Sequence, residues 1–290
     1  MSSIRPARIS GERGLRGRGR GYFNGDWHQM TAVTPKGLAS SSGRCKLCHN
    51  DRKLVKSHII PDWAYKRIYD SNHRILSVAS NTIVPIRFPR TGEWDRFVCS
   101  ECEEFFKYLD DYGRAIVFSR PGESTYGIST QRADYGANVL NVDYARMKLF
   151  QISILWRAGI SDRPFFEEIV LGAHEPILRQ MLVRRVPGDA IEYGCVMAAV
   201  KYAPKKMLSD LIARPFMSTV DGWSAARFFF AGCLWDYVLH DDAHDFPTRS
   251  LFLAPGAPLP IIVASVTDVA SLMNDIKWLQ HQIKNTGPAT

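Results

Sequence analysis

The sequence contains two cysteine pairs of identical spacing, Cys45-Lys-Leu-Cys48 and Cys99-Ser-Glu-Cys102. A Cys-x-x-Cys turn directs two sulfur atoms to one point, and two such turns supply the four thiolates of a structural zinc site. Residues 49–98 lie between the pairs, which is more than a minimal zinc ribbon contains. We therefore expect the four cysteines to bind one Zn²⁺ and to hold together the ends of a small folded insert.

Two other uses of these cysteines fit the sequence less well. No apolar signal segment opens the chain, and Cys195 and Cys233 lie in apolar runs like ordinary buried thiols, so disulfides are not expected. A thioredoxin-like redox site needs only one Cys-x-x-Cys pair, and a second pair favours metal. Because metal binding at such a site contributes folding free energy directly, we expect this region to unfold without zinc.

Length and composition indicate a two-domain protein without a membrane span. The 290 residues, 46% of them hydrophobic, are enough for one large or two modest cores. No uninterrupted apolar stretch approaches the roughly 20 residues that a membrane span requires. We therefore expect a cytoplasmic protein with no membrane partner.

The net charge of +8 is unevenly distributed along the chain. Residues 1–44 carry eight basic residues against Glu12 and Asp26, which leaves +2 for the remainder. Within that remainder, residues 45–74 hold seven basic residues against three aspartates, a local charge of +4 around His58. A local basic face favours contact with phosphates, so DNA is a candidate partner through non-specific basic contacts, although a solvated charged surface is the alternative.

The pattern along the chain predicts four regions. Residues 1–43 have the Arg/Gly-rich composition of a disordered tail, which is either a flexible extension or a non-specific nucleic-acid contact. Residues 44–118 form the zinc module, residues 119–138 a Gly- and Pro-containing connector, and residues 139–290 a mixed α+β domain that could select a substrate or a protein partner. The expected class of the whole chain is therefore α+β.

Periodicity places the expected elements within these regions. In the zinc module, strands are expected at 53–60, 75–78 and 82–88, a short helix at 61–68 and a longer helix at 103–117; the order knuckle, strands, knuckle, helix is a treble-clef layout. In the second domain, helices are expected at 139–158, 175–185 and 268–283, and strands at 193–202, 227–238 and 250–254.

The order of motifs between the cysteines resembles a known family. Cys45-x-x-Cys48, then Ser57-His58-Ile59-Ile60-Pro61, then Cys99-x-x-Cys102 is similar to the zinc-stapled branch of HNH endonucleases. In that family a histidine at the end of a strand is the general base in a metal-dependent attack of water on DNA phosphodiesters. The resemblance covers about 75 residues. It implies a bacterial ββα-metal nuclease with His58 as the base.

Two positions depart from the family pattern. Family members often carry an acid just before the histidine, where this chain has Ser57, and a histidine after the last cysteine, where it has Glu103. A carboxylate is a good ligand for a hard cation, so Glu103 is the candidate ligand for a catalytic Mg²⁺ or Mn²⁺. Glu103 could equally stabilise the first turn of a helix. The family's middle asparagine has no convincing counterpart, since Asn81 is distant from Cys99 and Asp95 is of another type.

Two functions therefore stay open at the level of sequence. The first is a divalent-metal-dependent HNH-like endonuclease acting on DNA, with His58 and Glu103 as catalytic residues. The alternative is a non-catalytic zinc module that binds nucleic acid or a protein partner, in which His58 only packs beside the zinc knuckle; a purely structural zinc clip is a weaker third reading. The cluster at residues 240–245 has two histidines and three acids, but Pro247 follows it closely, so we expect a polar turn there.

Overall fold

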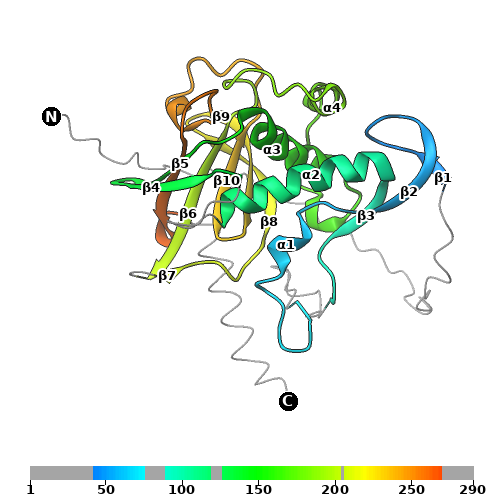
Figure 1. Cartoon of the computed structure of the whole chain (residues 1–290), viewed down its shortest axis with the longest axis horizontal. Helices are drawn as coiled ribbons and strands as arrows, with labels where there is room; N and C mark the ends of the chain where they lie inside the picture. Colours follow the sequence, from blue (N-terminus) through cyan, green and yellow to red (C-terminus); the bar gives the residue numbers. More distant parts are fainter. Residues whose placement is uncertain (1–41, 76–88, 119–125, 204–205, 270–290) are drawn as a thin grey trace, which may run out of the picture. The chain divides into compact units, whose positions relative to one another are not determined.

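The computed structural model describes residues 42–75, 89–118, 126–203 and 206–269, and all of them belong to one compact unit (Figure 1). This part of the chain contains a three-stranded sheet, an eight-stranded sheet and helices, which confirms the α+β class. The predicted tail lies outside the described residues, except that Ser42 and Gly43 belong to the first strand. No helix in these ranges is long and apolar enough to cross a membrane.

The small sheet lies beside both cysteine pairs and leads directly into a long helix. Its strands are antiparallel in the order β1-β2-β3. The strand predicted at 53–60 is confirmed, with bounds two residues earlier at Asp51–His58. The strands predicted at 75–78 and 82–88 lie outside the described residues, apart from Ile75, which forms a bridge with Tyr69. The elements are β1 (Ser42–Arg44), β2 (Asp51–His58), α1 (Asp62–Tyr65), β3 (Trp94–Cys99) and α2 (Ser100–Val117).

A register irregularity in the small sheet decides which residues face outward. The pairing of β2 with β3 shifts between Val55 and Lys56. Phe97 and Val98, which are neighbours in the sequence, are both buried as a result, with 3% and 0% of their surfaces exposed. Beyond the shift, Lys56 pairs with Arg96 and His58 pairs with Trp94, so these four side chains share the other face of the sheet.

The eight-stranded sheet is built mostly from antiparallel neighbours. Its order is β4-β5-β11-β6-β10-β9-β8, with β7 paired to β6, and β11 runs parallel to β6. The strands are β4 (Ser129–Ala133), β5 (Gly136–Leu140), β6 (Cys195–Ala203), β7 (Lys206–Met207), β8 (Ala213–Val220), β9 (Trp223–Phe230), β10 (Cys233–Val238) and β11 (Leu259–Ser265).

Three sequence-based expectations differ from this sheet. Residues 129–140 form the hairpin β4–β5, so the second half of the connector predicted at 119–138 contains a strand pair that was not expected there. The single strand predicted at 227–238 is a hairpin that turns at Ala231 and Gly232, both with positive φ. Residues 249–251 form a 3₁₀ turn instead of the predicted strand at 250–254, and β7, β8 and β11 were not predicted.

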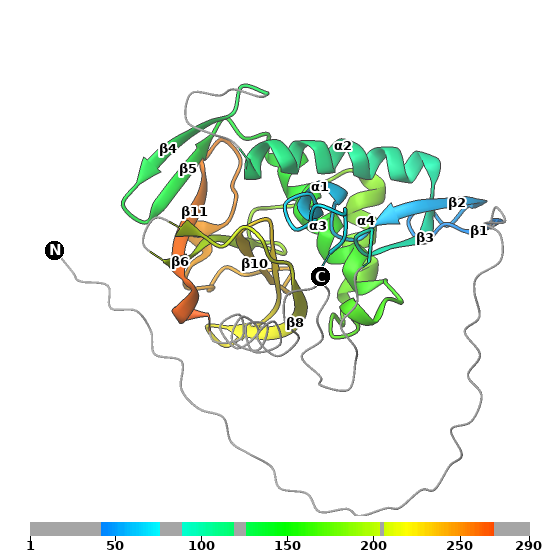
Figure 2. The same ribbon diagram turned by 90° about the horizontal axis from the view of Figure 1, so that it is seen from below.

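Helix α3 (Tyr144–Gly159) is the central helix of the described structure. All its residues from Met147 to Ala158 are buried, as expected for a helix that is apolar on nearly every face. It lies beside α2 and against the large sheet (Figure 2), and α4 (His174–Arg184) packs on it from another side. Gly113 allows α2 to approach closely, since a Cβ at this position would lie 2.5 Å from the Phe150 ring. The helix predicted at 268–283 lies outside the described residues beyond Val269.

One hydrophobic cluster extends from the zinc module into the large sheet. It includes Cys45 and Phe106 from the first region and Phe150, Trp156 and Trp235 from the second. Ring contacts connect these parts, with centroids 6.1 Å apart for Phe106 and Trp156 and 6.0 Å apart for Phe150 and Trp235. The domain boundaries at 118 and 139 stay predictions, but the residues on either side of them share a core.

Candidate metal centre and the adjacent sheet face

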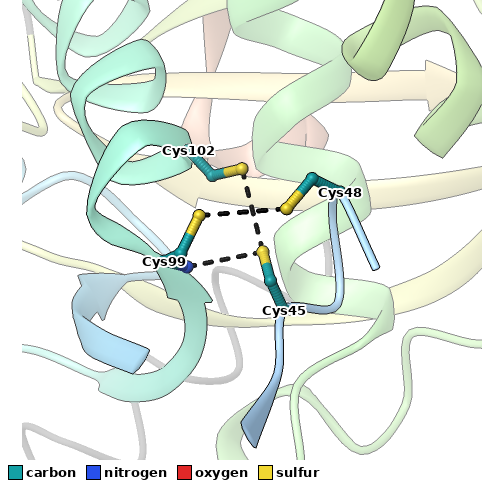
Figure 3. A group of neighbouring side chains, drawn as sticks. All are labelled: Cys45, Cys48, Cys99 and Cys102. Atoms are coloured by element: carbon teal, nitrogen blue, oxygen red, sulfur yellow. Dashed lines mark hydrogen bonds between the residues drawn. The ribbon is translucent and has the colours of Figure 1, made fainter. Parts of the chain in front are cut away.

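The two cysteine pairs converge on one point, as their spacing predicted (Figure 3). All four Sγ atoms lie within 4.8 Å of one another, with 3.7 Å between Cys45 and Cys102 and 3.9 Å between Cys48 and Cys99. Four sulfurs placed tetrahedrally at the usual Zn–S distance of about 2.3 Å would be about 3.8 Å apart. The separations therefore fit a tetrahedral ion such as Zn²⁺, and all four cysteines are free thiols rather than disulfides.

Different local structures position the two pairs. Cys45 and Cys48 lie on the turn between β1 and β2, which closes where His49 adopts a positive φ of 61°. Cys99 is the N-cap of α2 and Cys102 lies in its first turn, so the helix itself sets their separation. The turn is fixed to β3 because the Lys46 amide donates to the Phe97 carbonyl at 2.8 Å and the Cys99 amide donates to Cys45 Sγ at 3.4 Å.

The thiols strongly affect one another's ionisation. The hydrogen bond between Cys45 and Cys102 lowers the pKa of Cys45 to about 4 and raises the pKa of Cys102 well above its usual value. Burial raises the pKa of Cys48. One thiolate thus forms readily, whereas further thiolates are opposed by burial and by the charge already present. A divalent cation at the centre would remove this opposition.

The knuckle is also fastened to the helices of the second region. The Lys46 ammonium donates to the Ile160 carbonyl at 2.8 Å and pairs with Asp162 at 3.1 Å. Arg179 of α4 donates to the Leu47 carbonyl at 2.8 Å. The four cysteines therefore lie where the small sheet, α3 and α4 meet, and a change in their arrangement would affect all three.

His58, the predicted general base, ends β2 with most of its side chain buried. Its side chain is 18% exposed, and its Nε2 atom is buried 3.6 Å from Asp62 without a hydrogen bond. Burial lowers the pKa of His58 to about 4, and the positive charges of Lys56 and Arg157 act in the same direction. The imidazole is therefore uncharged at neutral pH and is a weak base.

Glu103, the predicted ligand for a catalytic metal, lies on the other side of β2 from the His58 side chain. It interacts with Ser57, and successive side chains of a strand point to opposite faces. The Oε2 atom of Glu103 and the Oγ atom of Ser57 are both buried without a hydrogen bond of normal length. Burial raises the pKa of Glu103 more than Ser57 and Arg157 lower it.

The structure does not assemble these residues into a second metal site. Among the described residues, the four cysteines form the one group of three or more Cys, His, Asp or Glu side chains whose ligand atoms converge. The cluster at 240–245 is a polar turn, as predicted, in which the Asp242 amide donates to His240 Nδ1 at 3.0 Å. Asp62 lies 3.6 Å from His58 Nε2, but in this part of the chain neither Asp62 nor Glu103 belongs to a group of three converging ligands.

Arg157 connects the three elements around His58, and the sequence did not single it out. Its guanidinium is 1% exposed and makes two hydrogen bonds to the Asp110 carboxylate, at 2.6 and 3.1 Å. It also donates to the His58 carbonyl at 2.8 Å and to the Ser153 carbonyl at 3.2 Å. Arg157 of α3 therefore fixes the end of β2 and the middle of α2, and it places a fixed positive charge beside the candidate site.

The outward face of the small sheet combines aromatic and basic side chains. Lys56 Nζ lies 4.9 Å from the Trp94 ring centroid, and the Arg163 guanidinium lies 5.6 Å from it. His58 and Arg96 complete this face, which we call the Trp94 face (Lys56, His58, Trp94, Arg96 and Arg163). The basic run at 45–74 predicted part of it, but Trp94 and Arg163 come from distant parts of the sequence.

The buried histidine gives a prediction about pH. Because the folded pKa of His58 is about 4 and its ordinary value is 6.5, the unfolded chain binds the proton first as the pH falls. His58 therefore costs up to about 3 kcal/mol of stability between pH 6.5 and pH 4. His58→Gln is expected to make urea-unfolding midpoints fall less steeply over this range. The exposed His244→Gln is the control, and equal slopes for His58→Gln and wild type would contradict the assignment.

Comparison of the chain with models of known protein families, with curated proteins and with solved structures found no match. The cysteine cluster and the Trp94 face are the features of the described residues that bear on function.

Proposed function

We propose that residues 44–118 form a zinc-bound treble clef, similar to that of zinc-stapled HNH endonucleases, and that its function in this chain is to bind nucleic acid. Support for the treble clef is the order of its parts: a knuckle with two cysteines, the antiparallel strands β2 and β3, and a helix whose N-cap and first turn carry the other two cysteines. The Trp94 face carries the functional part of the proposal, because cations interleaved with an aromatic ring are typical of nucleic-acid surfaces.

The charges on the module support a phosphate-binding role. Lys53, Lys56 and Lys66 are exposed. In the described ranges, the side chains of Lys53 and Lys66 make no ion pair or hydrogen bond with another residue. Exposed lysines without internal partners remain available for phosphates, and each contact releases a counterion from the nucleic acid. Binding of this kind needs no catalytic metal.

The environment of His58 favours binding over catalysis. A general base must reach the water that it deprotonates, and the Nε2 atom of His58 is buried. Its low pKa also makes it a poor proton acceptor at neutral pH. Asp110 is held in its ion pair with Arg157, so it is not available as a further ligand for a divalent cation beside Glu103.

One observation favours the nuclease as a second candidate. Ser57 Oγ and Glu103 Oε2 are buried and interact with each other, and neither has a hydrogen bond of normal length. They occupy the two positions where the HNH family carries metal ligands. In this alternative Glu103 would bind Mg²⁺ or Mn²⁺ and His58 would be the base. Plasmid nicking that depends on a divalent metal and is lost in His58→Ala would establish it.

The binding function predicts a salt-dependent affinity that residues of the zinc module control. For a short labelled DNA, replacing both Lys53 and Lys66 by Gln is expected to weaken binding and to reduce the slope of log K against log salt by about 2. The matched control replaces the exposed Lys201 and Lys206, which lie on the large sheet. Fluorescence anisotropy at several salt concentrations measures the affinity and its salt slope for each pair of variants. Equal effects of the two pairs, or no DNA binding by wild type, would contradict the proposal.

A further inference from the structure

Trp94 differs from the core tryptophans in what surrounds its ring. Trp63, Trp156 and Trp235 are at most 7% exposed and belong to the main hydrophobic cluster. Trp94 is partly exposed and belongs to none of the hydrophobic clusters of the described residues. Its ring instead has Lys56 and Arg163 as neighbours, at 4.9 and 5.6 Å from the ring centroid. Packing of the core therefore does not explain this side chain.

The ring is held in a defined orientation. The indole Nε1 donates to Thr91 Oγ1 at 3.2 Å, and the strand pairing of Trp94 with His58 fixes its backbone. The two cations reach it from separate elements, Lys56 from β2 and Arg163 from the segment after α3. Both cations lie over the partly exposed indole, where they mark an electron-rich ring surface. An unpaired nucleobase could take their place on this ring, and the cations would then be available for the phosphates that flank the base.

We propose that Trp94 is a stacking platform for an unpaired base, and that the module therefore prefers single-stranded nucleic acid. Lys56 and Arg163, which lie over the ring in the free protein, would move from it to the phosphates on either side of the base. This inference rests on the proposed nucleic-acid-binding function and adds the class of ligand. Bases in a duplex are already stacked on their neighbours, so a lone indole gains little from them. In a single strand every base has a free π-face, which makes the contact independent of sequence.

A purely structural role for Trp94 makes a different prediction. Arg163 Nε lies 3.8 Å from Asp95 Oδ2, so the indole could simply support this ion pair at the edge of the sheet. In that case replacing Trp94 would lower stability without any selective effect on single strands. The comparison of single-stranded with duplex affinity separates the two roles.

The test measures the affinity of the full chain for an oligothymidylate of about 15 nucleotides and for a duplex of the same length by fluorescence anisotropy. Trp94→Leu is expected to weaken single-strand binding about tenfold and to change duplex binding less than about twofold. Trp94→Tyr keeps an aromatic face and is expected to retain most of the affinity. Tyr108→Leu is the matched control, because Tyr108 is also exposed beneath an arginine, Arg146, but lies on α2.

Tryptophan fluorescence gives a second readout that does not depend on the Leu variant being stable. Oligothymidylate is expected to quench the emission of the wild-type chain, and Trp94→Tyr should lose that quenching. Equal losses of single-strand and duplex affinity in Trp94→Leu, or unchanged quenching in Trp94→Tyr, would overturn the stacking platform while leaving nucleic-acid binding intact. Absence of binding to both ligands by the wild-type chain would instead reject the proposed function and this inference with it.

Discussion

Removing the metal is expected to abolish the cooperative thermal unfolding transition of the purified chain. Binding of a structural zinc by four cysteines supplies about 10–16 kcal/mol of apparent free energy. A folded domain has a net stability of only about 5–15 kcal/mol. Chelation, or Cys99→Ala, should therefore unfold the small sheet and the start of α2, and elemental analysis should find about one zinc per folded chain.

The loss of order is expected to extend beyond the zinc module. Lys46 and Leu47 of the knuckle are bonded to the Ile160 carbonyl and to Arg179, so releasing the knuckle also frees α4 and the end of α3. Hydrogen exchange should show this as faster exchange in residues 174–184 as well as in 42–60 and 94–118. Cys233→Ala is the matched control, since this buried cysteine lies in β10 away from the cluster. A metal-free chain with an unchanged melting curve would disprove the metal site.

Local patterns were sufficient to predict the metal cluster and several of the helices and strands. The Cys-x-x-Cys spacing can be recognised without knowledge of the fold. It predicted that the four cysteines come together, and the convergence of their sulfur atoms confirms this. The buried helix α3 was likewise visible as a long run of apolar residues. β4 was missed because its sequence, Ser-Thr-Gln-Arg-Ala, lacks apolar alternation, and it is a strand because it pairs with β5.

Long-range pairing explains the remaining errors. β11 follows Pro258 and contains Pro260, which argue against a strand, yet it pairs in parallel with β6 and antiparallel with β5. The Trp94 face also depends on long-range pairing, because the register shift near Val55 decides which side of β3 faces outward. A sequence pattern does not reveal such a shift. Arg157 did leave a signal, since a charge inside an apolar helical run requires a buried partner, but nothing in the sequence selected Asp110.

Arg157→Met is expected to destabilise the folded chain by about 3–5 kcal/mol at neutral pH, because it leaves the Asp110 carboxylate buried without its charge partner. Asp110 loses the hydrogen bonds of 2.6 and 3.1 Å to the guanidinium, and the His58 carbonyl loses its bond of 2.8 Å. Methionine approximately preserves the apolar volume beside Phe106, over which Arg157 lies. The loss of unfolding free energy should therefore come from the unpaired charge rather than from a cavity. Denaturant unfolding measures this loss.

Two further measurements separate the charge effect from packing. Burial already raises the pKa of Asp110 and Arg157 lowers it, so the pKa should rise further in Arg157→Met. A carboxyl whose folded pKa is raised binds its proton more tightly in the folded chain, so the variant's deficit should shrink as the pH falls from 7 toward 4. Adding Asp110→Asn to Arg157→Met removes the buried charge and should restore part of the lost stability. A deficit that is independent of pH and unaffected by Asp110→Asn would show that Arg157 acts through packing alone.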